Sequence, residues 1–305
     1  MADLVNELVW SHSRANAFDG CRRAYWFAYY GSWGGWEKGA PKRAYDAWIQ
    51  KKLASRAMWI GTSVHRAAEA ELRRCRDGEE PWTVEDAVGA ARRRAEADLA
   101  ESKDGRWLQR PAKRLGLTEH YYEEPIERGG LEADIAEIER QVRVLWDQRL
   151  FRRLREVPDR IVELEDLRRF RVGDAEVWVV LDAMVLDGRG GAAIVDWKTG
   201  AAHAESDLDA QLGVYGLYAS NVRGIPVANL TAFHVNLRLG EEARHAVGVA
   251  ALGAAESRIG ASMAAMRAAL VDVAANRAEE PAFPPLPEGD AECRRCNFRG
   301  VCGRS

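Results

Sequence analysis

Three cysteines lie close together near the end of the sequence, in the segment CRRCNFRGVC at residues 293–302. Their C-x2-C-x5-C spacing brings three thiolates within reach of one centre, but a closed site needs a fourth ligand. The chain holds five cysteines, and the other two are Cys21 and Cys75; six histidines are the imidazole candidates. Cys75 lies in an arginine-flanked helical tail, whereas Cys21 precedes an aromatic-rich helix and is more typical of a built site. With Cys21 as the fourth ligand, the centre would join residue 21 to residue 293.

The compartment predicted for the chain bears on what these thiols bind. The N-terminal segment MADLVNELVW carries acids where a signal peptide needs bases, and no run of about twenty apolar residues is present. We therefore expect a cytoplasmic protein without a membrane partner, in a reducing compartment where clustered thiols bind metal more often than they form disulfides. The alternatives to a larger metal centre are a structural zinc ion, and a pair of reduced thiols or a disulfide in a surface tail.

A second group of reactive residues lies in EVWVVLDAMVLDGRGGAAIVDWKTG, residues 176–200. The glycine-rich stretch between two apolar runs is typical of a β-hairpin centred on Arg189. Folding the hairpin symmetrically places Asp182 opposite Asp196, with Cβ atoms about 4.5–5.5 Å apart. Lys198 shares their face because side chains alternate along a strand, although a slip of one residue would separate the group.

Two carboxylates facing each other on otherwise apolar strands repel and resist ionisation unless a cation lies between them. Oxygen ligands suit Mg²⁺ or Mn²⁺, which keep several waters and accept phosphate oxygens. Such a cation lowers the pKa of a bound water and neutralises charge that develops on a phosphorus centre, and a nearby lysine can orient the water. The simpler alternative is an Asp–Lys ion pair at the end of a strand.

The elements that must position these residues are predicted from two kinds of sequence pattern, one helical and one of short strands. Residues 14–155 are predicted to be helical, because runs such as 84–100 and 132–154 repeat apolar residues every three or four positions. Residues 161–237 contain short β-branched runs, with one helix before the last of them. The order is therefore helix, three strands, helix and strand, followed by a long helix over about 246–277. The net charge of −3 gives no global attraction to nucleic acid, although local arginine clusters are present.

Taken together, these segments resemble the PD-(D/E)XK nuclease superfamily. Asp182 with DWKTG at 196–200 is similar to the D-x(n)-(D/E)-x-K signature, in the form found in its RecB-like branch. GTSVHRAAEAEL at 61–72 is similar to the G-x-x-x-H helix of that branch, and QLGVYGLYA at 211–219 to its Q-x-x-x-Y motif. One early and three late cysteines resemble the arrangement that holds a 4Fe-4S cluster in the AddB nuclease domain and in the CRISPR-adaptation and exonuclease V families.

The resemblance implies a role for each matching residue. Metal ligands would be His65, Asp182, Asp196 and the carbonyl of Trp197. Lys198 would position the attacking water, while Gln211 and Tyr215 would contact DNA or steady the active site. The implied ligands of the 4Fe-4S cluster are Cys21, Cys293, Cys296 and Cys302. One of Glu69, Glu163 and Glu165 could complete the metal shell, and the sequence does not choose among them.

The implied fold class is α/β, a restriction-endonuclease-like αβββαβ core with a large N-terminal helical region and an iron–sulfur-bound tail. The expected segments are an N-terminal helical segment with the first cluster cysteine (1–60), a helical region with the histidine-bearing helix (61–160), the nuclease core (161–280) and the cysteine tail (281–305). The implied function is a Mg²⁺- or Mn²⁺-dependent deoxyribonuclease in DNA repair, recombination or defence.

The expected substrate is DNA that is single-stranded or has frayed ends, cleaved as an exonuclease. The sequence contains no G-x-x-x-x-G-K-[ST] motif, so unwinding of a duplex would require a helicase or another recombination or CRISPR partner. Two further hypotheses are a non-catalytic subunit that binds DNA ends within a larger complex, and a zinc-stapled nucleic-acid adaptor.

Overall fold

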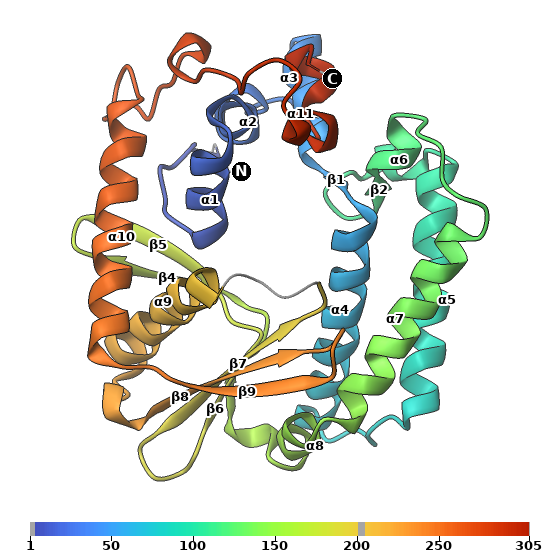
Figure 1. Ribbon diagram of the computed structural model, residues 1–305, viewed down its shortest axis with the longest axis vertical. Helices are drawn as coiled ribbons and strands as arrows, with labels where there is room; N and C mark the ends of the chain where they lie inside the picture. The colour runs from blue at the N-terminus through green and yellow to red at the C-terminus, as the bar shows by residue number, and fades with distance from the viewer. Residues whose placement is uncertain (1–3, 201–204, 305) are drawn as a thin grey trace.

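The computed structural model describes residues 4–200 and 205–304, and it has a mixed α/β architecture (Figure 1). The N-terminal region contains α1 (His12–Gly20), α2 (Arg22–Trp26), α3 (Lys42–Lys51), α4 (Arg56–Arg76), α5 (Val84–Lys103), α6 (Thr118–Tyr121), α7 (Gly130–Asp147) and α8 (Arg149–Glu156). Two short strands, β1 (Leu53–Ala54) and β2 (Gly116–Leu117), pair within this region. The prediction of a helical N-terminal half is therefore confirmed.

The second half contains the main sheet. Its strands are β3 (Ile161–Glu163), β6 (Ala183–Leu186), β7 (Ala192–Lys198), β8 (Leu230–Asn236) and β9 (Glu241–Ala246), hydrogen-bonded in the order β3-β6-β7-β8-β9. β7 and β8 are parallel and the other pairs are antiparallel. Helix α9 (Glu205–Arg223) connects the parallel pair, and α10 (Val249–Ala268) follows the last strand. Among the described helices, none combines the length and the apolarity needed to cross a membrane.

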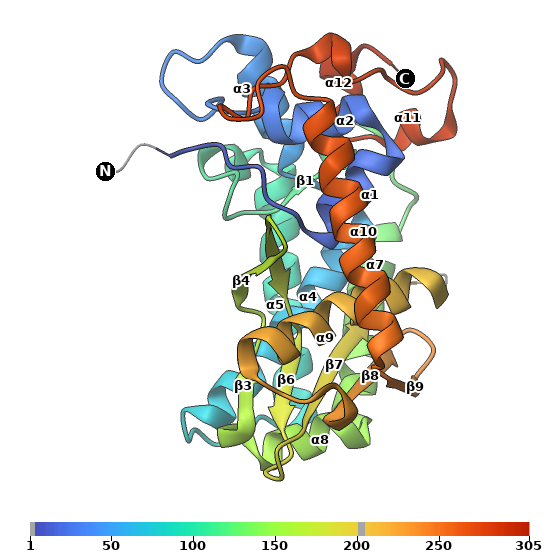
Figure 2. The same ribbon diagram turned by 90° about the vertical axis from the view of Figure 1, so that its left-hand side faces the viewer.

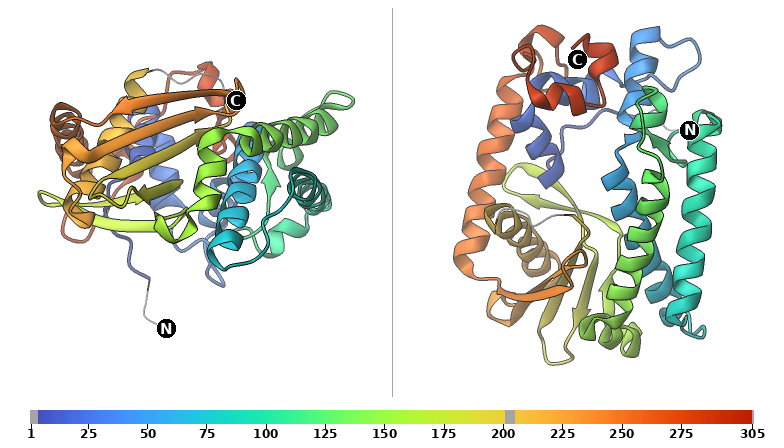
Figure 3. Two further views of the ribbon diagram at one scale, coloured as in Figure 1. Left: turned by 90° about the horizontal axis from the view of Figure 1, so that it is seen from below. Right: turned by 45° about the vertical axis from the view of Figure 1, so that its right-hand side comes forward.

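Helices cover both faces of this sheet, which explains why β7 is almost continuously apolar. Met184 and Ile194 point to one face and pack in a core with α9 and α10. Ala183, Val195 and Trp197 point to the other face and pack with α4, α5, α7 and α8. The view from below in Figure 3 shows the strands between these two sets of helices. The sheet therefore joins the helical region to the rest of the chain.

The predicted hairpin register is confirmed. Ala183 pairs with Val195 and Leu186 pairs with Ala192, so the hairpin is symmetric about Arg189. Asp187 accepts hydrogen bonds from the backbone N–H groups of Arg189 (2.6 Å) and Gly191 (2.9 Å), which fixes the turn. Asp182 directly precedes Ala183 and Asp196 directly follows Val195, so the two aspartates lie next to the last pair of the hairpin on opposite strands.

The expectation of three continuous strands before α9 is wrong, because two of the runs divide. The first gives β3 and then β4 (Leu167–Val172), and the second gives β5 (Ala175–Val180) and then β6. β4 and β5 pair with each other as a ribbon separate from the main sheet, and Val177 of β5 also forms a parallel bridge with Trp10. The ribbon is visible beside α9 in Figure 1 and near the β4 label in Figure 2. Glu165, at the first break, has a left-handed backbone (φ 52°) and donates its N–H to the carbonyl of Leu181, at the second break (2.9 Å). The two breaks therefore lie side by side.

The predicted long helix over 246–277 is also too long. Residues 241–246 form β9, and α10 ends at Ala268. Beyond it Asp272 and Arg277 form an isolated antiparallel bridge, which turns the chain back toward the N-terminal helices. The tail contains α11 (Ala291–Arg295) and α12 (Arg299–Cys302).

Helices α2 and α3 lie beside α11 and α12 at the upper end of the molecule in Figures 1 and 2. The rings of Phe27 and Phe298 stack with their centroids 5.7 Å apart. Arg23 donates a hydrogen bond to the carbonyl of Phe283 (2.8 Å) and forms an ion pair with Glu280. Packing therefore brings the early and late cysteines to the same region.

Candidate active site and four-cysteine cavity

The two aspartates and the lysine meet at the end of the central strands. Asp196 is fully buried in β7, and its Oδ1 accepts a hydrogen bond from the Nζ of Lys198 (2.8 Å). Asp182 is also buried, and its Oδ2 accepts a hydrogen bond from the backbone N–H of Trp197 (2.8 Å). The Trp197 side chain packs in the opposite core, as its odd position in the strand requires. The spacing in the sequence therefore predicted which side chains share this face.

Helix α4 brings His65 to the same point. Its Nδ1 lies 2.8 Å from Glu165 Oε1 and 3.5 Å from Asp182 Oδ1, while its Nε2 lies 3.1 Å from the carbonyl oxygen of Trp197. Ligand atoms of His65, Glu165 and Asp182 all lie within 4.8 Å of one another. Residues from four separate segments thus surround one small volume.

The three glutamates that the sequence left open have different surroundings. Glu163 is fully buried, but Arg168, Arg223 and the Tyr218 hydroxyl donate hydrogen bonds to it. Glu69 pairs with Arg73 one turn along α4 (2.8 Å). Glu165 instead faces His65 from the left-handed backbone position at the strand break. Glu165 is therefore the glutamate that joins the aspartates.

The charges of this site fit a bound divalent cation. Burial raises the pKa of Asp196 to about 6, and the nearby Asp182 adds to this rise while Lys198 opposes it. Burial also raises the pKa of Asp182, whereas His65 lowers it. Among the atoms of the described residues, Asp196 Oδ2 is buried and has no hydrogen-bond partner. A buried carboxylate oxygen without a donor is the kind of group that a hard cation satisfies.

The Q-x-x-x-Y motif on α9 makes a chain of hydrogen bonds to the lysine. Lys198 Nζ donates to Gln211 Oε1 (3.0 Å), and Gln211 Nε2 donates to the Tyr215 hydroxyl oxygen (2.5 Å). Tyr215 is buried, and burial raises its pKa well above the usual value for tyrosine. The geometry thus fits the second of the two roles considered for this motif, which is to steady the active site.

Two contacts behind the lysine were not predicted. A Cβ atom on Gly61 would lie only 2.8 Å from Thr199 Oγ1, so the glycine of G-x-x-x-H lets α4 approach the residue after Lys198. Gln141 of α7 is buried, and its Nε2 donates a hydrogen bond to the Thr199 carbonyl (3.0 Å). The signal in the sequence for the second contact was a glutamine on the buried face of an amphipathic helix, because a buried amide group needs a hydrogen-bond partner.

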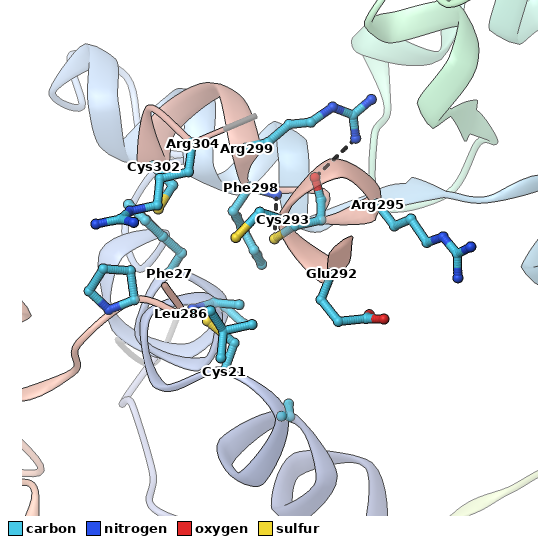
Figure 4. A pocket seen from close by; sticks show the side chains of 16 residues that line it. Cys21, Phe27, Leu286, Glu292, Cys293, Arg295, Phe298, Arg299, Cys302 and Arg304 are labelled. Carbon is cyan, nitrogen blue, oxygen red and sulfur yellow. Dashed lines mark hydrogen bonds between the residues drawn. The ribbon is translucent and has the colours of Figure 1, made fainter. Parts of the chain in front are cut away.

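The four predicted cluster cysteines line one cavity of about 290 Å³ (Figure 4). Cys21 comes from the N-terminus of α2, where its sulfur accepts a hydrogen bond from the Ala24 N–H (3.5 Å). Cys293, Cys296 and Cys302 come from the tail. Burial raises the pKa of Cys296 to about 11, and the other three thiols contribute to the rise. Cys75 lies elsewhere, buried against Glu71 on α4.

The sulfur atoms are spread around this cavity. Across the described residues, no three cysteine sulfurs lie within 4.8 Å of one another. Sulfur ligands of one tetrahedral zinc ion are about 3.8 Å apart, as bond lengths of about 2.3 Å require. The cysteines therefore do not form a preformed tetrahedral zinc site, and the cavity has room for a larger group.

A model of the PD-(D/E)XK nuclease superfamily matches residues 9–303. The match covers nearly all of the chain, so the protein belongs to this superfamily, whose members are typically nucleases that use divalent metals. No curated protein matches the sequence. The family assignment and the mixed α/β fold thus confirm the coarser part of the resemblance found in the motifs.

Proposed function

We propose that this protein is a Mg²⁺- or Mn²⁺-dependent deoxyribonuclease that hydrolyses phosphodiester bonds. The observation that carries the proposal is the convergence of Asp182, Asp196 and Lys198 with His65 and Glu165 at the end of the central strands. A copy that had lost catalysis would have no need to keep two buried aspartates in mutual repulsion beside a lysine. The alternative of a non-catalytic subunit therefore has less support.

The residues proposed to hold the cation are Asp182, Asp196, Glu165, His65 and the carbonyl of Trp197. When bound, a divalent cation supplies an activated water and neutralises charge that develops on the phosphate. Asp182 is held for this task by the Trp197 N–H, and its other oxygen faces His65. Asp196 binds Lys198 through one oxygen and keeps the other available.

Lys198 is proposed to orient the attacking water and to stabilise charge on the phosphate. Its ammonium group already has two fixed acceptors, Asp196 Oδ1 and Gln211 Oε1, which leave one of its three N–H donors for the substrate. Gln211 is in turn oriented by Tyr215, so the motif on α9 sets the direction of the lysine. Gln211 and Tyr215 are therefore proposed as positioning residues.

The cavity lined by Cys21, Cys293, Cys296 and Cys302 is proposed to hold a structural 4Fe-4S cluster. The support is that four thiols from both ends of the chain line one cavity. Protein purified without oxygen should be brown and absorb light at about 400 nm, whereas a zinc protein is colourless. A colourless protein that contains one zinc per chain would contradict the cluster and favour the zinc alternative.

The proposed substrate is DNA that is single-stranded or frayed at an end, degraded as an exonuclease by a member of the RecB-like branch. The order of the His65 helix, the Asp182 and Asp196 strands and the Gln211 helix supports this branch. A helicase or another recombination or CRISPR partner is proposed to supply unwinding, within repair, recombination or defence.

The decisive experiment compares labelled single-stranded and double-stranded DNA with Mg²⁺, with Mn²⁺ and with EDTA. Wild-type protein should cleave DNA only with a metal, and Lys198→Ala should be inactive while retaining its melting temperature. Cleavage that persists in EDTA, or at an equal rate in the Lys198→Ala protein, would contradict the proposal.

A further inference from the structure

A second cavity adjoins the active site on the side of the ribbon, with a volume of about 320 Å³. We name it the Trp178 groove. The ribbon contributes Leu167, Trp178 and Val180 to its lining, α9 contributes Gln211, Val214 and Tyr215, and the start of α1 contributes Ser11 and Ser13. Since Gln211 also accepts a hydrogen bond from Lys198, the groove begins one side chain away from the catalytic lysine.

The ribbon presents an unusually apolar surface here. Along β5, Val177 and Val179 point into the core, whereas Trp178 and Val180 point outward. Leu167 pairs with Val180 across the ribbon, and these two side chains are 50% and 39% exposed. Adjacent exposed apolar residues next to the proposed catalytic site are more typical of a ligand-binding surface than of a surface that contacts only solvent.

The tryptophan is held in a fixed orientation. The guanidinium carbon of Arg169 lies 4.3 Å from the centroid of the Trp178 ring, and the indole N–H donates to Glu176 Oε1 (3.4 Å). Arg169 also lies 3.5 Å from Glu7 and 3.4 Å from Glu176, so its charge is already paired. The groove thus offers a fixed aromatic ring and apolar walls. The guanidinium group of Arg169 is paired with glutamates and is not directed at a phosphate.

These features fit a flat, mostly apolar group with polar edges. We propose that the Trp178 groove binds one unpaired nucleobase of the DNA strand, next to the phosphate that is cleaved. The inference rests on the proposed nuclease function, and it gives a physical reason why the nuclease would prefer single-stranded or frayed DNA to an intact duplex. A base that enters the groove must leave its partner, at a cost of a few kcal/mol in a duplex but not in a single strand or a frayed end.

Binding is tested without catalysis, by the fluorescence anisotropy of a labelled single-stranded oligothymidylate in EDTA. Stacking of one base on an aromatic side chain predicts a Kd about 5- to 150-fold weaker for Trp178→Ala. Trp178→Phe keeps a ring and should restore most of the affinity. Trp36→Ala is the control, because Trp36 is an exposed tryptophan (38%) in a loop outside the groove, and it should bind like wild type.

A scan with one abasic position sharpens the test. Wild-type protein should lose affinity when the abasic position occupies the groove, and Trp178→Ala should show no further loss there. Unchanged affinity in Trp178→Ala, or an equal loss in Trp36→Ala, would overturn the inference. The outcome can be separated from that of the nuclease proposal. Cleavage with unchanged Kd and KM in Trp178→Ala would refute base binding in the groove alone. Trp178-dependent binding without any cleavage would refute the nuclease proposal alone.

Discussion

The carboxylate site and the four-cysteine cavity are held in place by different kinds of structure. Asp182 and Asp196 extend from a hairpin whose turn and register are fixed by backbone hydrogen bonds, and β7 is paired on both sides. The cysteines lie in and beside α2, α11 and α12, which have five, five and four residues. Helices so short have little stability of their own, since isolated helices below about 12 residues are marginal in water.

The difference indicates separate tasks for the two sites. The sheet fixes the backbone that bears the carboxylates, so a metal bound there would serve the reaction. Short helices and a few contacts between the chain ends position the cysteines, so a bound cluster there would serve the fold. Substitutions in the first site should remove activity and spare stability, and substitutions in the second should lower stability first.

The largest expected effect is on catalysis, from Asp196→Ala. The variant should lose at least about 100-fold in cleavage rate, because it removes a proposed metal ligand and an acceptor of Lys198. Its melting temperature should be unchanged or higher without metal, since the repulsion between the two buried aspartates is removed. Cleavage and melting curves measured on the same sample check both parts, and Asp196→Ala protein that cuts DNA as fast as wild type would refute the assignment.

Cys21→Ser and Cys302→Ser should have the largest effect on stability. Joining such distant positions restrains the unfolded chain by about 4–5 kcal/mol if the cluster acts as a covalent cross-link does. Both variants should lose the brown chromophore, melt at a lower temperature and cleave DNA less well. Cys75→Ser should show none of these changes because Cys75 lies outside the cavity. Iron content equal to wild type in Cys21→Ser would contradict the cluster assignment.

Glu165→Gln should have an intermediate effect that is specific to the metal. Loss of one carboxylate should raise the Mg²⁺ or Mn²⁺ concentration for half-maximal cleavage about 10- to 100-fold. Glu69→Gln is the matched control, since Glu69 pairs with Arg73 and lies outside the metal cluster. A titration of rate against metal concentration separates the two, and equal curves for Glu165→Gln and wild type would exclude Glu165 as a ligand.

Gly61→Ala should have the smallest effect. Its new methyl group would meet the Thr199 hydroxyl and displace the end of β7 slightly, which should lower kcat by about 10-fold. The control is Gly253→Ala on α10, where nothing lies near the added Cβ, and it should raise stability by up to about 1 kcal/mol. A kcat for Gly61→Ala equal to that of wild type would mean that Thr199 moves without disturbing Lys198.

The sequence was sufficient to predict the β6–β7 hairpin and its register, because a glycine-rich turn and an alternating pattern determine which residues face each other. Asp182, Asp196 and Lys198 needed no long-range information. His65 and Gln211 came from motif resemblance, since their proximity depends on how α4 and α9 pack on the sheet. The choice of Glu165 over Glu69 and Glu163 depended on a left-handed backbone position that no glycine or proline marks.

The missed features share a physical cause. The runs 161–172 and 175–186 contain no glycine or proline, so no turn residue marks the break between the strands of each run. Strand β9 is mostly exposed and polar, and it therefore lacks the apolar alternation that identifies a strand. The surroundings of Trp178 depend on the same break, because the ribbon leaves the sheet there.

Because β4 pairs with β5 outside the main sheet, the ribbon side of the Trp178 groove belongs to a different hydrogen-bonded ladder from the β6–β7 hairpin beside the aspartates. A substitution on the outer face of the ribbon would change the surface that is proposed to meet a DNA strand, while the β6–β7 ladder and its carboxylates should keep their positions. The proposed contact with the substrate and the proposed hydrolytic residues therefore lie on different hydrogen-bonded ladders, so a substitution in the ribbon should alter the first and leave the second in place.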